Sequence, residues 1–450
     1  MTDLISVQWL AGQLPDRTMR GIATTTGALI RSGTIAVGMK LPAVRDLALV
    51  LGVSPATVSA AWSELRKFKV ISGRGRTGIW VCGDKVTPRP LRYEGVGNYG
   101  ADALDLSTAT PDMSLLPALD EALRYAARVD RLNSYERVPI LDGLEAAIRP
   151  QWPYAAEAFL ATNGGYDAVY ATLQTLIRPG STVAIEDPTA MRLLDIVDNL
   201  GAQVIPVACD EAGPEPASLA AALAKAPAAF VYQPRTHSVT GRMVSADRMV
   251  DLARVLARSE TLIVEDDGLG AISAMPSASL GRVFPDRTIH IHSLSKSFGP
   301  DLRLAVLSGS ADLVQQIQAY RSFSAGWTSR ILQAAASWLL CDPDTTKGID
   351  RARRVYADRR RALIAALDAR GMRIADRDGL CLWIPVKSEQ FAVVTMAARG
   401  IAILPGRKCT IRHSEHIRVA TSLLTAEVET VADALALANP EDTWDRFPSR

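Results

Sequence analysis

The sequence predicts an α/β chain of two parts: a small N-terminal winged helix-turn-helix domain, and a large α/β domain that ends in a smaller α+β subdomain. Residues 155–308 alternate short apolar runs of strand type with helical patterns, which is typical of a mostly parallel sheet covered by helices. Residues 350–439 carry two further helical patterns, at 351–370 and 426–438. Residues 1–83 form a basic segment with a net charge of +6, whereas the remainder carries −4.

The length and composition agree with this division. A chain of 450 residues is too long for one ordinary domain. Residues 84–104 are rich in Pro and Gly and lack sustained periodicity, so they are predicted to link a domain at 1–83 to one at 105–450, whose small subdomain spans roughly 340–450. The start lacks the basic region of a signal peptide, and no apolar run is long enough to span a membrane. The five cysteines are scattered along the chain and form no C-x-x-C pair. We therefore expect a cytoplasmic protein without disulfides, metal ligands or membrane contact.

The basic segment has the pattern of a DNA-binding domain. Helices are expected at 16–30, at 41–52 with Pro42 in the first turn and Gly52 at the C-terminus, and at 55–69 with Ser54 as the N-cap. Residues 71–81, two short apolar runs around a segment of glycines and arginines, are predicted to form a hairpin with a basic tip. A helix-turn-helix with a basic wing binds duplex DNA through the second helix of the motif and the arginines of the wing. The candidate DNA contacts are Arg45, Thr57, Arg74 and Arg76.

This segment resembles the winged helix-turn-helix of the GntR superfamily over residues 8–83. The motif G-x-x-L-P-S-x-R-x-L-A is represented by Gly38 and residues 41–48, and the motif G-V-S-R-x-T-V by residues 52–58. Two positions depart from it. The serine of the first motif is Ala43, and the arginine of the second is Pro55, so the family's base contacts do not transfer directly.

Lys296 is the most informative residue of the large domain. It follows the apolar run 288–292 among small hydroxyl residues, a setting in which a lysine can lose its proton and form a Schiff base with an aldehyde cofactor. Arg303, seven residues on, offers a planar fork of donors to a phosphate. Glu265, Asp266 and Asp267 end another apolar run and could place a carboxylate against a pyridinium nitrogen. These are the three groups that pyridoxal 5'-phosphate (PLP) needs from a protein.

A glycine turn adds a second phosphate anchor. Gly164, Gly165 and Tyr166 precede the helical pattern at 167–177, and glycines that open a helix expose backbone N–H groups to an anion. Seen alone, a Gly-Gly pair is equally well a plain turn, and a lone lysine or arginine is usually surface charge. The order and context of these residues favour the cofactor site.

The large domain resembles the fold-type I aminotransferases, and the fused arrangement resembles the MocR subfamily of GntR regulators over nearly the whole chain. The family pattern S-K-x-x-x-P-x-x-R matches Lys296, Pro300 and Arg303. The resemblance implies that Lys296 forms the Schiff base and that Arg418 and Arg192 bind the carboxylate of an effector. It also implies a homodimer in which Tyr135 reaches the cofactor phosphate of the neighbouring subunit. The implied cofactor-binding set is Gly164, Gly165, Tyr166, Asp266, Ser293, Ser295, Lys296, Arg303 and Tyr135.

Four positions depart from the aminotransferase pattern. Ala190 stands where the family has an aromatic ring that stacks on the pyridine, and Gly268 where it has a tyrosine near the phenolic oxygen of the cofactor. The asparagine of the family is not evident around Ser238, and a usual glycine is Ile140. The loss of stacking removes about 1–2 kcal/mol of cofactor binding.

Three functions remain open from the sequence. The first, which we favour, is a PLP-dependent transcriptional regulator rather than an enzyme. It would bind a double-stranded DNA operator and sense an amino acid, an amine or a vitamin B6 compound through the lysine imine. The second is a metabolic aminotransferase with an accessory DNA-binding domain, against which Ala190 and Gly268 count. The third is a regulator that binds its effector without PLP.

Overall fold

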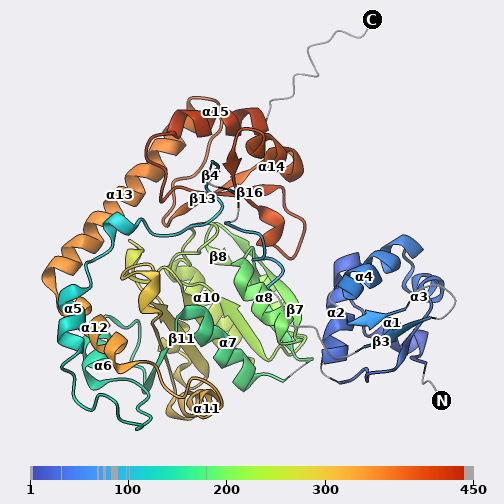
Figure 1. The fold of residues 1–450 in the computed structure, drawn as a ribbon, viewed down its shortest axis with the longest axis horizontal. Helices are drawn as coiled ribbons and strands as arrows, with labels where there is room; N and C mark the ends of the chain where they lie inside the picture. The colour runs from blue at the N-terminus through green and yellow to red at the C-terminus, as the bar shows by residue number, and fades with distance from the viewer. Residues whose placement is uncertain are drawn as a thin grey trace, which may run out of the picture. The chain divides into compact units, whose positions relative to one another are not determined.

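The computed structural model describes residues 4–31, 33–67, 70–73, 78–82, 90–97, 99–100, 102–178 and 180–439. The chain divides into two compact units: the first comprises residues 1–91 with 177–183 and 195–204, and the second comprises 92–176, 184–194 and 205–450 (Figure 1). Within the described residues, no helix is both long and apolar enough to cross a membrane.

The N-terminal unit is a winged helix-turn-helix. Its wing is a three-stranded antiparallel sheet in the order β1-β3-β2. The turn between α3 and α4 follows from two caps: Gly52 adopts a φ of 68° after α3, and the Ser54 Oγ accepts the Thr57 N–H at 3.1 Å. The elements are α1 (Val7–Gly12), α2 (Met19–Arg31), α3 (Val44–Leu51), α4 (Pro55–Lys67), β1 (Lys40–Leu41), β2 (Ile71–Ser72) and β3 (Ile79–Val81).

The prediction that a helix begins at Leu41 was wrong. Lys40 and Leu41 form β1 and pair with Trp80 and Ile79 of β3. A residue before proline is disfavoured in the α conformation, so Pro42 keeps Leu41 extended and makes it available to the sheet. The helix starts only at Val44, after Ala43, whose side chain makes no capping hydrogen bond.

The large unit is built on an eight-stranded sheet in the order β5-β12-β11-β10-β9-β6-β7-β8. Strands β9, β10 and β11 are parallel, whereas β12 pairs antiparallel with both β11 and β5. All six residues of β10 are buried, as expected for a central strand covered on both faces. The strands are β5 (Ala158–Thr162), β6 (Thr182–Asp187), β7 (Gln203–Asp210), β8 (Gly213–Pro214), β9 (Ala229–Tyr232), β10 (Leu262–Asp267), β11 (Thr288–Ser293) and β12 (Ala305–Gly309).

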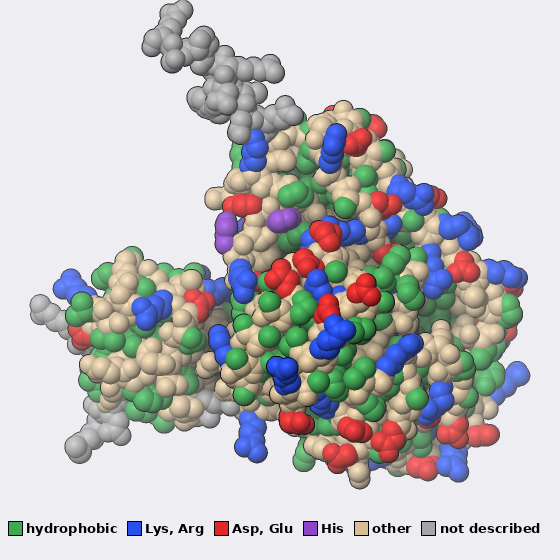
Figure 2. All heavy atoms as spheres, turned by 180° about the vertical axis from the view of Figure 1, so that it is seen from behind, with side chains coloured by type: hydrophobic (Ala, Val, Ile, Leu, Met, Phe, Trp, Pro, Cys, Tyr) green, Lys and Arg blue, Asp and Glu red, His purple; other side chains and the backbone are tan. Residues whose placement is uncertain are grey.

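Helices cover this sheet, as the ribbon shows (Figure 1). On the face of the molecule drawn in Figure 2, Lys and Arg side chains are interspersed with Asp and Glu over the large unit. Charges of both signs thus share this surface. The helices are α5 (Asp120–Ala126), α6 (Asp142–Ile148), α7 (Gly165–Leu176), α8 (Met191–Asn199), α9 (Pro216–Leu223), α10 (Ala246–Leu256), α11 (Ala311–Arg321) and α12 (Arg330–Cys341).

The C-terminal subdomain packs helices on a small sheet in the order β13-β16-β15. Strand β4 (Leu104–Asp105) pairs with β14 of this subdomain, so the chain already contributes to it at the end of the predicted linker. The long helix α13 begins at Pro343, eight residues before the helical pattern recognised in the sequence. The elements are α13 (Pro343–Asp368), β13 (Cys381–Pro385), α14 (Glu389–Ala397), β14 (Ile401–Ala402), β15 (Leu404–Pro405), β16 (His416–Ala420) and α15 (Val428–Ala438).

Candidate functional site

The candidate site lies where the carboxyl ends of β10 and β11 meet. Parallel strands end at the same edge of a sheet, which is where ligands bind in open α/β folds. Asp266 lies opposite Ile291, and Asp267 opposite His292, so both acidic residues reach this edge beside Ser293. Lys296 follows three residues later, in the turn after β11.

The amine of Lys296 is held in a position suited to reaction. Its Nζ donates a hydrogen bond of 2.7 Å to the carbonyl oxygen of Ala109. Burial lowers the pKa of this amine to about 8, and the positive charges of Arg418 and Arg192 add to the effect. A larger fraction of the neutral amine is therefore present near neutral pH than for an ordinary lysine.

We expect the trapping of Lys296 by a small aldehyde, with borohydride reduction and peptide mass mapping, to follow this pKa. Only the neutral amine attacks an aldehyde, so the rate should rise with pH and level off above about 8. Lys347 is the control, because its hydrogen bond with Asp344 raises its pKa. Its rate should still be rising where that of Lys296 is constant. Parallel profiles for the two lysines would contradict the assignment.

Asp266 is a buried carboxyl with one side-chain donor. Burial raises its pKa to about 6, the hydrogen bond from Gln233 opposes this shift, and the charge of Asp267 adds to it. The Nε2 of Gln233 donates to Oδ2 of Asp266 at 2.8 Å. A buried carboxyl of this kind gains from a cationic partner such as a pyridinium nitrogen.

A glycine cradle, formed by Gly164 and Gly165 at the start of α7, lies beside this carboxyl. Gly165 opens α7, and a Cβ on Gly165 would stand 3.3 Å from Cβ of Ser293 and 3.8 Å from Oδ1 of Asp266. Gly164 has a φ of 111°, which favours glycine, and a Cβ there would lie 3.2 Å from Nη2 of Arg303. A side chain at Gly165 would therefore crowd Ser293, and one at Gly164 would crowd the Arg303 guanidinium.

Hydroxyl and guanidinium donors complete this cradle. The Oγ atoms of Ser293 and Ser295 lie 2.9 Å apart. Arg303 is exposed and donates from Nη2 to the carbonyl oxygen of Asn163 at 3.2 Å. The donors are those that hold a phosphate: the N-terminus of a twelve-residue helix, two hydroxyls and an arginine. The residues present therefore fit PLP.

The two predicted carboxylate-binding arginines both act on the electrostatics of Lys296. Arg418, on β16, is buried, and its Nη2 donates to the carbonyl oxygen of Ser107 at 2.7 Å, whereas its Nε has no hydrogen-bond partner among the described residues. The guanidinium of Arg192 lies 4.3 Å from the ring centre of Tyr166 and 5.2 Å from that of Tyr93. Both guanidinium groups lower the pKa of Lys296, as two cations near one site should.

The remaining predicted residues lie elsewhere or outside the described residues. Tyr135 is 88% exposed and packs edge-on against Trp327. Arg45 is exposed on α3, and Thr57 lies in the first turn of α4, where its Oγ1 is 2.9 Å from the Ser54 Oγ. Arg74 and Arg76 fall outside the described residues. Gln233, Ala109 and Ser107 contact the site but were not found from the sequence.

Two comparisons with known proteins extend these observations. Residues 101–435 match the family model described as aminotransferase class I and II, and residues 21–81 match that described as bacterial regulatory proteins, gntR family. The chain is 31% identical to the vitamin B6 salvage pathway transcriptional repressor PtsJ of Salmonella typhimurium, over 90% of this chain and 94% of the relative. It is 25% identical to the pyridoxine biosynthesis transcriptional regulator PdxR of Corynebacterium glutamicum, over 83% and 85% of the two chains.

Solved structures show the same fold for the large unit. The kynurenine aminotransferase of Pyrococcus horikoshii matches with a TM-score of 0.69 and 18% identity, over 75% of this chain and 91% of its own. The α-aminoadipate aminotransferase LysN of Thermus thermophilus matches with a TM-score of 0.67 and 22% identity, over 75% and 93%. At these identities the likeness concerns the fold.

Proposed function

The chain belongs to the MocR-type transcriptional regulators of the GntR family, in which a GntR domain precedes an aminotransferase class I and II domain, and we propose that it senses a vitamin B6 compound at Lys296. The proposal rests on the Asp266 carboxyl and the glycine cradle, which lie together at the sheet edge that Lys296 follows, and on the lowered pKa of the Lys296 amine. The relatives PtsJ and PdxR are named for vitamin B6 salvage and pyridoxine biosynthesis, which supports the choice of ligand.

Different residues of the chain are proposed to bind different parts of PLP. PLP supplies an aldehyde that condenses with a primary amine. Lys296 provides that amine, and its depressed pKa keeps a reactive fraction neutral. Asp266 would bind the pyridine nitrogen, and the start of α7 would bind the phosphate together with Ser293, Ser295 and Arg303. Arg418 and Arg192 are placed to attract the carboxylate of an amino acid that joins the site.

Two positions favour sensing over efficient turnover. Ala190 is buried and offers no ring to stack on a pyridine. Gly268 offers no phenol, and a Cβ there would lie 3.4 Å from Oδ2 of Asp266. A sensor tolerates a loosely oriented cofactor, whereas transamination requires close orientation. We propose that any transaminase activity is a residual half-reaction.

The response to the ligand would be transmitted to DNA. We propose a homodimer that acts in the cytoplasm, with α4 in the major groove and Arg45 on the phosphate backbone. Tyr135 is proposed to contact the cofactor phosphate of the partner subunit, and its 88% exposure leaves it accessible to a second chain. A ligand with different affinity for two arrangements of the dimer shifts the population between them, and with it the affinity for the operator.

The test is operator binding with and without PLP. Duplexes selected from a random pool by the full-length protein would be labelled, and their binding followed by fluorescence anisotropy. We expect PLP to change the apparent Kd at least about fivefold, the lower range of allosteric coupling. Lys296→Ala should lose most of this response, whereas the surface variant Lys347→Ala should keep it. An equal Kd with and without PLP in the wild type, at a concentration that saturates the site, would contradict the proposal.

A further inference from the structure

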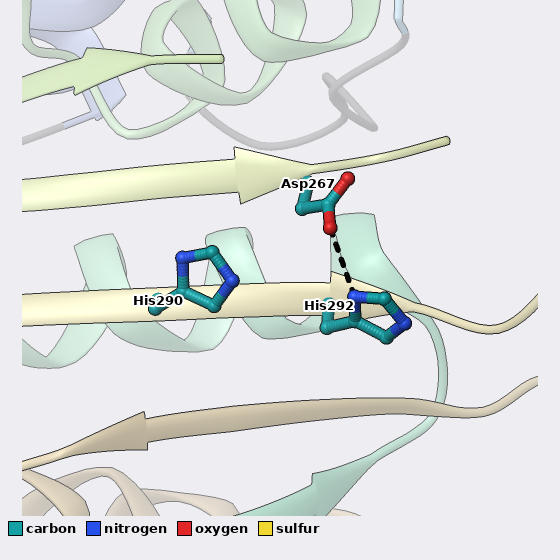
Figure 3. A group of neighbouring side chains, drawn as sticks. All are labelled: Asp267, His290 and His292. Carbon is teal, nitrogen blue, oxygen red and sulfur yellow. Dashed lines mark hydrogen bonds and ion pairs between the residues drawn. The ribbon is translucent and has the colours of Figure 1, made fainter. Parts of the chain in front are cut away.

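Beside the cofactor site, two histidines and an aspartate converge across β10 and β11. His290 and His292 lie two residues apart on β11, so they share one face of the strand. Asp267 lies directly opposite His292 on the parallel strand β10. One donor atom from each of the three side chains lies within 4.8 Å of the others (Figure 3).

His290 presents a nitrogen that has no partner. Its Nδ1 lies 2.8 Å from Oε2 of Glu265, whose Oε1 accepts hydrogen bonds from the Tyr232 hydroxyl and the Leu280 N–H, both at 2.7 Å. This arrangement places the proton of His290 on Nδ1 and leaves a lone pair on Nε2. The side chain is 98% buried, and Nε2 has no hydrogen-bond partner among the described residues. In Figure 3, that nitrogen points toward Asp267 and His292.

Asp267 and His292 supply the other two donors. Oδ2 of Asp267 lies 2.9 Å from Nδ1 of His292, and Oδ1 accepts the Gly270 N–H at 3.1 Å. Arg235 is the nearest cation, with Nη1 3.5 Å from Oδ2, but it is also bound to the carbonyl oxygens of Met275, Gly270 and Ser273. His292 is 12% exposed, so the edge of the cluster is open to solvent.

We propose that Asp267, His290 and His292 form a site for a divalent transition metal ion of the zinc class. Two imidazoles and one carboxylate make a three-ligand set typical of zinc sites that keep an open position, and imidazole excludes the oxygen-selective Mg²⁺ and Ca²⁺. The pair His290–Glu265 has the form of a carboxylate that orients a metal-binding histidine. When the ion binds, it replaces the hydrogen bond between Asp267 and Nδ1 of His292; the neutral His292 imidazole then carries its one proton on Nε2, and a second proton, if the ring was charged, is released to solvent.

The proposed metal site lies beside the proposed cofactor-binding residues, so metal binding can affect their positions. Asp267 is adjacent in sequence to Asp266, and His292 to Ser293. An ion that fixes these two side chains would also fix the ends of β10 and β11, where the cofactor-binding residues lie. The metal site does not depend on PLP binding, since none of its three donors belongs to the proposed cofactor set.

The first test measures metal binding by the full-length protein after chelator treatment. Zn(II) should bind with one equivalent per chain in calorimetry, and Co(II) should give visible ligand-field bands. His292→Gln removes a donor from the more open edge of the cluster and should weaken Zn(II) binding at least about tenfold, as loss of even an outer partner does. His413→Gln is the matched control, because this histidine is 84% exposed and pairs with Glu415 outside the cluster.

Two results would overturn the proposal. The first is that the wild type fails to bind Zn(II) with one equivalent per chain; this result does not depend on the folding of any variant. The other is an equal loss of affinity in His413→Gln and His292→Gln, which would indicate binding elsewhere on the surface. Equal melting temperatures of His292→Gln and wild type in chelator would show that the variant is folded. If that variant unfolds, Asp267→Asn, read by the Co(II) bands, replaces it.

Discussion

Lys296→Ala should abolish covalent capture of PLP. In the wild type, borohydride reduction in the presence of PLP should add the mass of one pyridoxyl phosphate to each chain, at Lys296. The variant lacks the amine whose pKa burial lowers to about 8, so no addition is expected at this position. Intact-mass spectrometry followed by peptide mapping measures the change.

The lysine itself contributes little to folding, which makes the result interpretable. Among the described residues its one hydrogen bond goes to the Ala109 carbonyl oxygen; such a bond from a charged donor is worth about 1.5–3 kcal/mol, which the cost of burying the amine offsets. The variant should therefore still bind PLP without a covalent bond, through Asp266 and the glycine cradle, with a higher Kd. The surface variant Lys347→Ala should give the mass addition of the wild type. Capture of PLP at the wild-type level in Lys296→Ala would refute the role of this lysine. If neither the wild type nor any variant captured PLP, the result would favour a regulator that binds its effector without PLP.

The sequence predicted the architecture well because its signals are local. Apolar runs mark the buried strands, and caps such as Ser54 and Gly52 mark the turn of the DNA-binding motif. The error at Leu41 has a physical cause: the helical periodicity ran on through Pro42, but the proline restricts the residue before it. Strand β1 has only two residues, too few to show the alternation of apolar and polar residues by which a strand is recognised in a sequence.

The missed residues depend on strand register, which a single sequence does not specify. Gln233 lies 33 residues from Asp266, and the two meet because Tyr232 of β9 pairs with Glu265 of β10, which places the next residue of each strand side by side. The same is true of Asp267 and His292, which pair across β10 and β11. The sequence predicts no metal ligands because the five cysteines are scattered and the histidines form no ligand spacing with them. Of the proposed metal ligands, only His290 and His292 lie close in sequence.

The second large effect is expected in the DNA-binding unit, for Trp62→Ala. Trp62 lies on the inner face of α4 and is fully buried in the core of the winged helix-turn-helix, with Leu47, Leu51 and Val58. Replacing a buried tryptophan by alanine costs about 3–5 kcal/mol, because the apolar contacts are lost and a cavity remains. A small domain has a total stability of about 5–15 kcal/mol, so most of it can be lost.

Because the two units have separate cores, the damage should be selective. We expect Trp62→Ala to lose operator binding near physiological temperature and to lower or remove one thermal transition. The second transition, and the PLP capture at Lys296, should stay as in the wild type. Trp9→Ala is the matched control, since Trp9 on α1 is 39% exposed and does not belong to this core.

The Trp62→Phe variant tests whether packing, rather than the indole itself, is the cause. The Nε1 of Trp62 has no hydrogen-bond partner among the described residues, so the side chain acts through its apolar volume. Phenylalanine keeps much of that volume and should restore a large part of both stability and operator binding. Trp62→Ala could instead remove PLP capture together with DNA binding. The two units would then unfold as one cooperative unit. In that case the signal between ligand and operator would pass through a shared core, and not through a change in the arrangement of separate domains.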